Sequence, residues 1–335
     1  MSKPKVTIII PVFNVKKFLP ECLDSVLNQS LSEIEVICGD GGSTDGSLEI
    51  LHEYEKKDSR FIVVSKNGSG YGQSINDCMD LANGEYIGIV ESDDSIRQDM
   101  YEKMYTKAKE NDLDWIKGDV YLYYSGRKRN QLVREPISNN AAPYNVVLNP
   151  QTDYRPYQCN LRTWSGIYKT DYLRRNGIRH NETPGGSYQD VGFFLKTMYF
   201  AERVMFIDEP FYLWRQDNPG SSIHYDSEKL VKKSLKEWEL EREYLDSHNE
   251  LGQMAYGCYN HRKFLSYRWT IQMGKGTIRE YAENIAKQEL LAAMENKEID
   301  KQFFQKRDWN ELNKLVKTGH LCNPIISKIK RLIGQ

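Results

Sequence analysis

Short apolar runs alternate with segments of helical periodicity over the first 124 residues of the chain. Runs such as VTIIIPV (6–12) contain consecutive β-branched residues without polar alternation, which is typical of parallel strands buried on both faces. The same kind of run recurs at 33–38, 61–65, 85–90 and 114–124. Between these runs, apolar residues at helical spacing predict helices over 18–30, 43–57, 72–82 and 100–111. This alternation predicts an α/β fold, in which helices cover both faces of a mostly parallel, Rossmann-like sheet.

The periodicity changes after residue 124. Residues 125–160 are polar, contain prolines and show no clear period, so we expect a long functional loop or lid there. A helix over 187–201 and a strand over 203–208 follow, and the pattern is then helical over 227–245, 252–273 and 278–297. We therefore predict an α/β domain over 1–225, with halves 1–124 and 125–225, and a helical C-terminal module over 226–335.

Composition excludes some classes of function. The net charge of −1 over 335 residues gives no electrostatic case for binding nucleic acid. No run approaches the length of a membrane span, and the first residues lack the pattern of a signal peptide. The six cysteines are scattered without a C-x-x-C pair. We expect them to be reduced thiols in a cytoplasmic protein, with no disulfide or zinc framework.

A glycine-rich segment, GDGGSTDGS (39–47), follows the second predicted strand. Ligands of open α/β sheets bind outside the carboxyl ends of the strands, and glycines allow a backbone to approach a ligand closely. We expect Asp40 to project toward such a ligand, beside free N–H groups of a helix that begins near Ser43. The alternative is an ordinary strand-to-helix turn, capped by Ser43 and Thr44.

The fourth predicted strand runs into three acidic residues, Glu91, Asp93 and Asp94. Carboxylates this close repel one another and raise one another's pKa unless a cation neutralises them. Mg²⁺ and Mn²⁺ bind one or two carboxylates together with the phosphates of a substrate. The alternative is a solvated acidic turn that caps the next helix.

Four segments, in this order, resemble the family 2 glycosyltransferases of the GT-A fold. They are TIIIPVFNVKKFLPECLDSVLNQS (7–30), GDGGSTDGSLEIL (39–51), ANGEYIGIVESDD (82–94) and SYQDVGFF (187–194). The resemblance covers roughly residues 5 to 225. It implies an inverting, metal-dependent transfer of a sugar from a nucleotide-sugar donor, such as a UDP-sugar, to a glycan or lipid-linked glycan acceptor. Bacterial surface-polysaccharide synthesis is the setting that it implies, with Mn²⁺ or Mg²⁺ as cofactor.

The resemblance assigns a donor side and a metal site. The residues expected to bind the nucleotide-sugar are Pro11, Phe13, Asp40, Asn67, Gly70, Tyr71, Gln73, Ser92, Asp93 and Arg215. The residues expected to bind the metal are Glu91 and Asp93, which match the D-x-D motif of the family, and His224. The chain departs from the family pattern at three positions. Gly41 replaces the second acid of D-D-G-S-T-D-G-S, Gln73 stands near a common arginine, and Glu91 replaces the first aspartate of D-x-D.

The acceptor side is expected in the second half of the domain. Asp190 in SYQDVGFF matches the catalytic base of the family, which accepts the proton of the acceptor hydroxyl as that oxygen attacks. Trp164, Tyr188 and Gln189 are expected near the acceptor. Two alternatives stay open at this point. Asp190 can be a first-turn aspartate favoured by the helix dipole, and Trp164 can fill the core.

Two further interpretations concern the C-terminus and other classes of protein. The segment NPIISKIKRLIGQ (323–335) predicts a basic amphipathic helix, which can make a peripheral contact with the membrane or pack on the helical module. A nicotinamide dehydrogenase would need G-x-G-x-x-G where the chain has PVFNVKK (11–17). A response-regulator domain would explain the acids but not Asp190 or the long insertion. A non-catalytic nucleotide-sugar or glycan-binding module remains the alternative.

Overall fold

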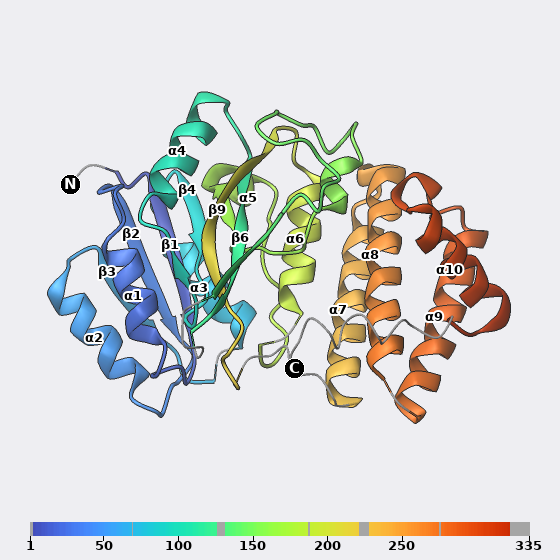
Figure 1. Ribbon diagram of the computed structural model, residues 1–335, viewed down its shortest axis with the longest axis horizontal. Coiled ribbons are helices and arrows are strands. Elements are labelled where there is room, and N and C mark those ends of the chain that lie inside the picture. The colour runs from blue at the N-terminus through green and yellow to red at the C-terminus, as the bar shows by residue number, and fades with distance from the viewer. Residues whose placement is uncertain are drawn as a thin grey trace. The chain divides into compact units, whose positions relative to one another are not determined.

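The computed structural model describes residues 3–68, 70–125, 131–186, 188–220, 228–274 and 276–321. The chain divides into two compact units, residues 1–222 and 223–335, which are described separately (Figure 1). The predicted metal ligand His224 and the predicted C-terminal amphipathic segment 323–335 lie outside the described residues.

The first half of unit 1 has the predicted alternation of strands and helices. Its elements are β1 (Val6–Val12), α1 (Leu19–Leu27), β2 (Ile34–Asp40), α2 (Ser47–Lys57), β3 (Phe61–Ser65), α3 (Tyr71–Leu81), β4 (Tyr86–Ile89), β5 (Ser95–Ile96), α4 (Met100–Glu110) and β6 (Trp115–Tyr124). The second half contains β7 (Gln131–Glu135), a 3-10 helix (Arg155–Gln158), β8 (Gly166–Lys169), α5 (Thr170–Arg175), α6 (Gln189–Tyr199) and β9 (Val204–Arg215).

One mixed sheet forms the centre of unit 1. Its strand order is β3-β2-β1-β4-β8-β6-β9-β5, and β7 also pairs with β6. Strands β3, β2, β1 and β4 are parallel neighbours, whereas β8 is antiparallel to both β4 and β6. Every residue of β1, β2 and β4 is buried, because helices such as α3 and α2 pack on the sheet. The predicted α/β class is confirmed, with antiparallel pairs added by the second half.

The sheet register brings the ends of the first strands to one edge. Val12 of β1 pairs with Asp40 of β2, which pairs with Ser65 of β3. In the sheet, β1 lies between β2 and β4. The chain therefore builds the sheet outward from β1 in one direction with β2 and β3, and in the other direction with β4. The carboxyl ends of β1 and β4 therefore border the crevice in which open α/β sheets bind ligands.

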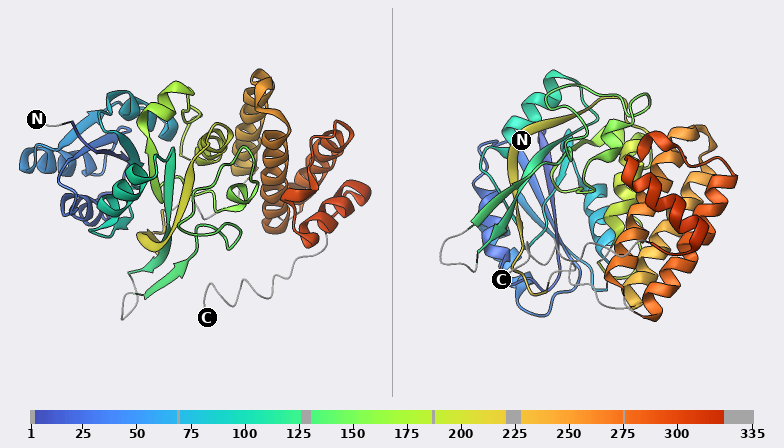
Figure 2. Two further views of the ribbon diagram at one scale, coloured as in Figure 1. Left: turned by 90° about the horizontal axis from the view of Figure 1, so that it is seen from above. Right: turned by 45° about the vertical axis from the view of Figure 1, so that its right-hand side comes forward.

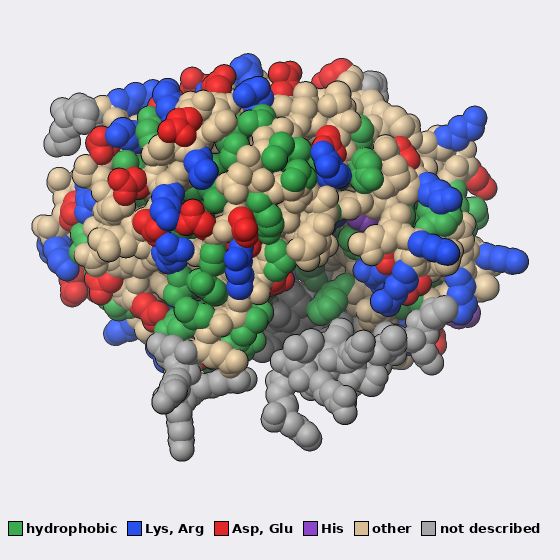
Figure 3. Space-filling model, turned by 45° about the horizontal axis from the view of Figure 1, so that its top comes forward, with side chains coloured by type: hydrophobic (Ala, Val, Ile, Leu, Met, Phe, Trp, Pro, Cys, Tyr) green, Lys and Arg blue, Asp and Glu red, His purple; other side chains and the backbone are tan. Residues whose placement is uncertain are grey.

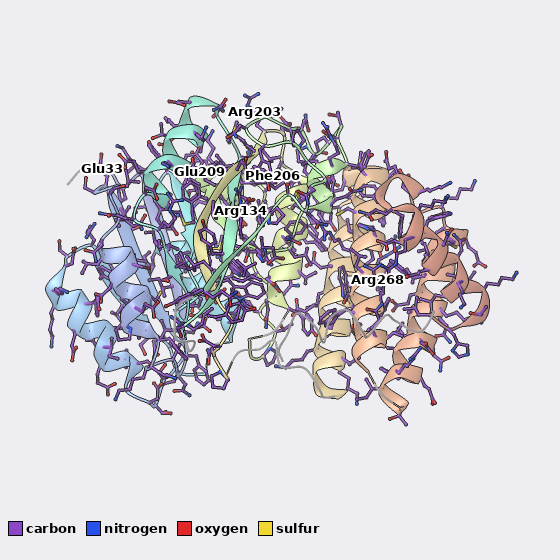
Figure 4. All side chains as sticks on the ribbon, viewed as in Figure 1. Glu33, Arg134, Arg203, Phe206, Glu209 and Arg268 are labelled. Carbon is purple, nitrogen blue, oxygen red and sulfur yellow. The ribbon has the colours of Figure 1, made fainter. Side chains whose placement is uncertain are left out.

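We expected a long loop or lid over 125–160, and the described part is turns and loop except for β7 and the 3-10 helix Arg155–Gln158. Strand β7 pairs antiparallel with β6, from Val120 opposite Glu135 to Tyr124 opposite Gln131 (Figure 2). Arg134 of β7, labelled in Figure 4, donates to the buried carboxylate of Asp119 on β6, with Nε 2.9 Å from Oδ2. Ile137, Leu148 and Tyr157 are buried as well. The segment is therefore anchored to the domain at these points.

Helix α2 begins later than predicted. The predicted caps Ser43 and Thr44 lie in a loop, and α2 starts at Ser47 after Gly46 in the left-handed region, with φ +97°. The carboxylate of Asp45 accepts hydrogen bonds from the backbone N–H and the hydroxyl of Ser47, at 3.0 and 2.6 Å. Asp45 therefore satisfies an N–H donor of the first turn, a role that we predicted for Ser43 and Thr44.

Unit 2 is helical, as the sequence pattern predicts. It contains α7 (Glu228–Ser247), a 3-10 helix (Asn249–Leu251), α8 (Gly252–Met273), α9 (Thr277–Glu295), a 3-10 helix (Lys301–Phe303) and α10 (Lys306–Thr318). Helix α8 packs on α7 and α9, and α10, which was not predicted, packs on α9. The indole of Trp238 donates to the hydroxyl of Ser266 at 3.1 Å, which ties α7 to α8.

Two smaller findings concern the cysteines and the membrane. The five cysteines among the described residues are buried and form no disulfide with one another: Cys22, Cys38, Cys78, Cys159 and Cys258. In the described part of the chain, no helix is both long enough and apolar enough to cross a membrane.

Candidate functional site

The loops that follow β1 and β2 are joined by hydrogen bonds. Asn14, in the left-handed region with φ +49°, accepts from the backbone N–H of Thr44 through Oδ1 at 2.8 Å. Its own N–H donates to the hydroxyl of Ser43 at 3.0 Å, and the N–H of Lys16 donates to Asp45 at 2.9 Å. This network holds the two loops as one surface at the carboxyl edge of the sheet.

Phe13 and Pro11, both predicted on the donor side, have different environments. The Phe13 side chain is 63% exposed, although it comes directly after a fully buried strand. Pro11 is buried within β1 and pairs with Gly39 of β2. Phe13 is therefore the residue of this pair that offers an accessible surface to a ligand.

Asp40 does not project from the strand end as expected. Its side chain is 1% exposed, and its oxygens accept from the N–H groups of Gly42 and Ser43, at 3.1 and 3.2 Å, and from the Ser65 hydroxyl at 3.0 Å. Gly39 is also used for packing, because a Cβ there would lie 2.5 Å from Oγ of Ser74 on α3. Asp40 therefore organises the glycine-rich loop from within.

The first turn of α3 lies against the segment that precedes α6. A Cβ on Gly72 would lie 2.0 Å from the carbonyl oxygen of Asn181, and one on Gly70 would lie 2.8 Å from that of Thr183. The N–H of Tyr71 donates to the carbonyl of Gly185 at 3.0 Å. The two glycines thus permit a close approach between the predicted donor and acceptor halves.

The remaining residues of this region divide into two groups. The Tyr71 hydroxyl donates to Oε1 of Glu91 at 2.5 Å, so it lies at the acidic segment. Asn67 is exposed beside the glycine-rich loop, since a Cβ on Gly42 would lie 3.0 Å from its Oδ1. Gln73 instead donates along its own helix to Asp77 at 2.8 Å. The structure therefore places Tyr71 and Asn67 with the candidate site and turns the amide of Gln73 toward α3.

The acidic segment after β4 is held in place by β9. The Tyr212 hydroxyl accepts from the N–H of Glu91 and donates to Oδ2 of Asp94, both at 2.9 Å. The N–H of Arg215 donates to Oδ1 of Asp94 at 2.7 Å. Asp94 and Ser92 are buried, whereas Glu91 and Asp93 are partly exposed. Tyr212 was missed in the sequence analysis, because no local pattern shows that β9 lies beside this segment.

Two carboxyl groups of this segment, those of Glu91 and Asp94, have raised pKa values. Burial raises the pKa of Glu91 to about 8, the Tyr71 hydrogen bond opposes this, and repulsion from Asp93 and Asp190 adds to it. Burial, with repulsion from Asp93, also raises the pKa of Asp94 well above its usual range. Such raised values are typical of sites that use a charge partner.

The pair Glu91 and Asp93 has the chemistry to bind a divalent cation. Oε2 of Glu91 and Oδ1 of Asp93 accept no hydrogen bond from any described residue, while Oδ2 of Asp93 accepts from Asn218 at 2.7 Å. Two hard carboxylate oxygens suit Mg²⁺ or Mn²⁺ when substrate phosphates supply further ligands. Within the described ranges, no three His, Cys, Asp or Glu residues converge as a complete protein site.

Arg215 is buried beneath the acidic segment. Its side chain, 2% exposed, donates from Nε to the carbonyl of Asp93, from Nη1 to the hydroxyl of Ser125, and from Nη2 to Glu21, at 2.7, 2.7 and 2.5 Å. The guanidinium also lies 4.8 Å from the ring centre of Phe18. We expected Arg215 to contact a diphosphate, but this geometry makes it a positioning residue for the Asp93 backbone.

Asp190 lies in the first turn of α6, and its neighbours shape that turn. Tyr188, half-buried and with φ +73°, precedes the helix, and the amide of the buried Gln189 donates to Oγ1 of Thr183 at 2.9 Å. Asp190 is half-buried, and its charge raises the pKa of both Glu91 and Tyr71. Tyr71 links the acidic segment to the approach to this helix, because its hydroxyl donates to Glu91 and its N–H donates to the carbonyl of Gly185.

Trp164 packs inside the protein beside these residues. It is 8% exposed, and its ring centre lies 4.1 Å from that of Tyr212 and 5.7 Å from that of Trp214. The guanidinium of Arg162 lies 4.7 Å from the Trp214 ring. Because Tyr212 fixes the acidic segment, Trp164 acts here as a packing residue beneath it.

Comparison with known proteins now identifies the family. The family model described as glycosyl transferase family 2 matches residues 7–182, which is more than half of the chain. The chain belongs to glycosyltransferase family 2. The matched region contains β1 to β4, the acidic segment and the first turn of α3.

Curated relatives are bacterial glycosyltransferases. The chain is 32% identical to the uncharacterized glycosyltransferase EpsJ of Bacillus subtilis (strain 168) over 223 residues, which cover 65% of this chain and 62% of EpsJ. It is 38% identical to glycosyltransferase GlyG of Streptococcus pneumoniae serotype 4 over 217 residues, which cover 63% of this chain and 70% of GlyG. The chain thus spans less than two thirds of the length of EpsJ.

A solved structure confirms the predicted fold class. The crystal structure of S. aureus TarS 1-349 in complex with UDP-GlcNAc superposes with a TM-score of 0.63 at 21% identity, over 94% of this chain and 92% of that one. At this level of identity, the similarity shows the fold alone. Because the superposition covers 94% of this chain, it includes most of the helical second unit.

Proposed function

We propose that this protein transfers a sugar from a nucleotide-sugar donor, most simply a UDP-sugar, to a glycan or lipid-linked glycan in cell-surface polysaccharide synthesis. Membership of glycosyltransferase family 2 supports sugar transfer, and the fold shared with TarS, solved with UDP-GlcNAc, supports a UDP-sugar. The observation that carries the proposal is the double contact of Tyr71, whose hydroxyl donates to Glu91 and whose N–H donates to the carbonyl of Gly185, in the segment that leads to Asp190.

The donor side of the proposed site lies at the carboxyl edge of β1, β2 and β4. Phe13 and Asn67 offer exposed side chains, and Asp40 shapes the loop between them. Glu91 and Asp93 would hold Mg²⁺ or Mn²⁺ through their open oxygens. When bound, the ion would supply positive charge for the diphosphate. Arg215 keeps Asp93 in place through its backbone carbonyl.

Asp190 is the proposed catalytic base of an inverting transfer. Its carboxylate would accept the proton of the acceptor hydroxyl while that oxygen forms a bond to the anomeric carbon. The bond from the anomeric carbon to the diphosphate oxygen breaks on the opposite face, so the configuration inverts and the nucleoside diphosphate leaves. Asp190 is half-buried, and repulsion from it contributes to the raised pKa of Glu91.

The proposed setting is the cytoplasmic face of the membrane. Buried cysteines that form no disulfide with one another among the described residues agree with a reducing compartment. A basic amphipathic segment at 323–335 would bring the enzyme near a lipid-linked acceptor.

Release of nucleoside diphosphate from a panel of nucleotide-sugars tests the proposal. We expect release by the wild-type protein with Mn²⁺, loss of release with a chelator, and loss with Asp190→Asn. A non-catalytic nucleotide-sugar or glycan-binding module is the competing function. Binding of a donor without release under any of these conditions, and without an effect of Asp190→Asn, would favour that module.

A further inference from the structure

The short segment that follows β9 and leads to Asn218 is tied to the end of β6. The N–H of Gln216 donates to the carbonyl of Tyr123 at 2.8 Å. One residue further on, Oδ2 of Asp217 accepts from the hydroxyl of Ser125 at 2.9 Å. Asn218 therefore starts from a backbone that the central sheet holds in place.

Both ends of the Asn218 side-chain amide have a partner. Oδ1 accepts from the N–H of Gly220 at 2.9 Å, and Nδ2 donates to Oδ2 of Asp93 at 2.7 Å. Because a backbone N–H can only donate, the contact with Gly220 decides which end of the amide faces Asp93. Asn218 therefore presents an N–H group, and not an oxygen, to the acidic segment.

Among the described residues, Asn218 alone donates a hydrogen bond to the side chain of Asp93. Arg215 and Tyr212 hold the acidic segment through its backbone and through Asp94. None of those hydrogen bonds reaches the Asp93 carboxylate. The direction of this carboxylate, with Oδ2 occupied and Oδ1 open, therefore depends on Asn218.

The donor at this position carries no charge. Arg134, by contrast, places a guanidinium on the carboxylate of Asp119 at 2.7 Å, and that contact compensates the charge of the acid. An amide fixes the direction of a carboxylate but leaves its negative charge for another partner. The pairing of Asp93 with Asn218 therefore suits an acid that has to attract a cation.

A diphosphate needs such a cation because the surrounding surface has no strong positive field of its own. On the left of the face in view, Figure 3 shows Lys and Arg side chains interspersed with Asp and Glu side chains. Mixed charges of this kind do not attract an anion over a distance. A divalent ion on Glu91 and Asp93 would supply the positive charge locally.

We propose that Asn218 is a positioning residue for the divalent cation of the proposed site. Its amide keeps Oδ2 of Asp93 occupied and Oδ1 open to the ion. Hydrogen bonds to a ligating carboxylate raise metal affinity because they fix the direction of the ligand before the ion binds. The inference rests on the proposed function and concerns its metal site alone.

Calorimetry of the full-length protein tests the proposal, with UDP alone and with UDP and Mn²⁺ as probes. Asn218→Leu keeps a side chain of similar shape but removes the donor. It should weaken Mn²⁺ binding in the presence of UDP by about ten- to a hundredfold, the usual effect of losing a partner of a metal ligand. Asn218→Ala, which adds no apolar group, should give the same loss. The affinity for UDP without Mn²⁺ should stay within about twofold of wild type, since the amide acts through the metal ligand.

Gln216→Leu is the matched control in the same segment. The Gln216 amide donates to the backbone carbonyl of Trp214 at 3.2 Å and not to an acid, so its loss should leave Mn²⁺ affinity within about twofold of wild type. Urea denaturation of each variant reports whether it is folded.

Three results would overturn the role of Asn218 while sugar transfer stands. They are an unchanged Mn²⁺ affinity in both Asn218 variants, an equal loss in Gln216→Leu, and a parallel loss of UDP binding without metal. If the wild-type protein binds UDP equally with and without Mn²⁺, the metal site of the proposed function is wrong, and the role of Asn218 is wrong with it.

Discussion

The hydroxyl group of Tyr71 donates a 2.5 Å hydrogen bond to Oε1 of Glu91, while the backbone N–H of the same residue donates to the carbonyl of Gly185. Tyr71 thus connects the acidic segment after β4 with the segment that leads to Asp190. A single residue at the start of α3 therefore sets the relative position of the proposed donor and acceptor groups.

The first prediction is that Tyr71→Phe lowers kcat of sugar transfer roughly tenfold. Loss of a hydrogen bond to a charged group costs about 1.5–3 kcal/mol, and about 1.4 kcal/mol corresponds to a factor of ten. Steady-state kinetics with the identified donor check this. Tyr105→Phe is the control, since the Tyr105 hydroxyl donates to Glu85 at 2.9 Å on the other side of β4 and outside the proposed site. Equal kcat in wild type and Tyr71→Phe would remove the positioning role.

The second prediction is that Asp93→Asn abolishes the Mn²⁺-dependent part of UDP binding. The change keeps the size of the side chain but removes the negative charge that would attract a divalent ion. Calorimetry with UDP, with and without Mn²⁺, measures the effect. Asp99→Asn removes an acid that pairs with Arg97 and Lys103 and should leave UDP binding unchanged. If Asp93→Asn binds UDP with the same metal dependence as wild type, Asp93 is not a metal ligand.

The third prediction is that Asp190→Asn reduces kcat by about a hundredfold or more, the usual scale for a general base, while donor binding stays nearly intact. Single-turnover transfer and UDP-sugar calorimetry measure the two quantities separately. Asp171→Asn is a suitable control, because Asp171 is an exposed first-turn aspartate of α5. A parallel fall of donor affinity and rate would make Asp190 a binding or structural residue.

The strands and helices of the first half could be predicted because their signals are local. The β-branched run of β1 and the helical spacing of α3 each reflect contacts made by one continuous segment. Strand β8 has only four residues, and its neighbours β4 and β6 lie far away in sequence. Its antiparallel pairing, and with it the mixed character of the sheet, depends on long-range packing that no local period records.

The site was predictable in residue type more than in side-chain direction. The acids Glu91, Asp93 and Asp190 could be picked out by their place after a strand or by resemblance, and Tyr71 links the segments that carry them. The burial of Asp40 and Arg215 could not, because it depends on N–H groups, carbonyls and hydroxyls contributed by other segments. A motif gives the chemistry of a side chain, whereas its partners come from tertiary structure.

The last prediction concerns stability in acid and uses His180, which precedes α6. Its ring is buried and stacks on Phe193, with ring centres 4.2 Å apart and planes 6° apart. Burial, together with the nearby charge of Lys196, lowers the pKa of His180 to about 3. In the unfolded chain a histidine titrates near pH 6.5, so between about pH 6.5 and about pH 3 the unfolded state binds a proton that the folded state does not.

The free energy of unfolding should therefore fall as the pH falls through this window, by about 1.4 kcal/mol per pH unit for His180 alone. His180→Phe keeps a stacked ring but cannot bind a proton, so its unfolding free energy should depend less on pH by that amount. Urea denaturation between about pH 6 and about pH 4 measures both slopes. His52→Gln, a change at an exposed position on α2, should keep the wild-type slope. If His180→Phe also keeps that slope, the imidazole is protonated in the folded state and the ring must be more accessible to solvent than its packing on Phe193 implies.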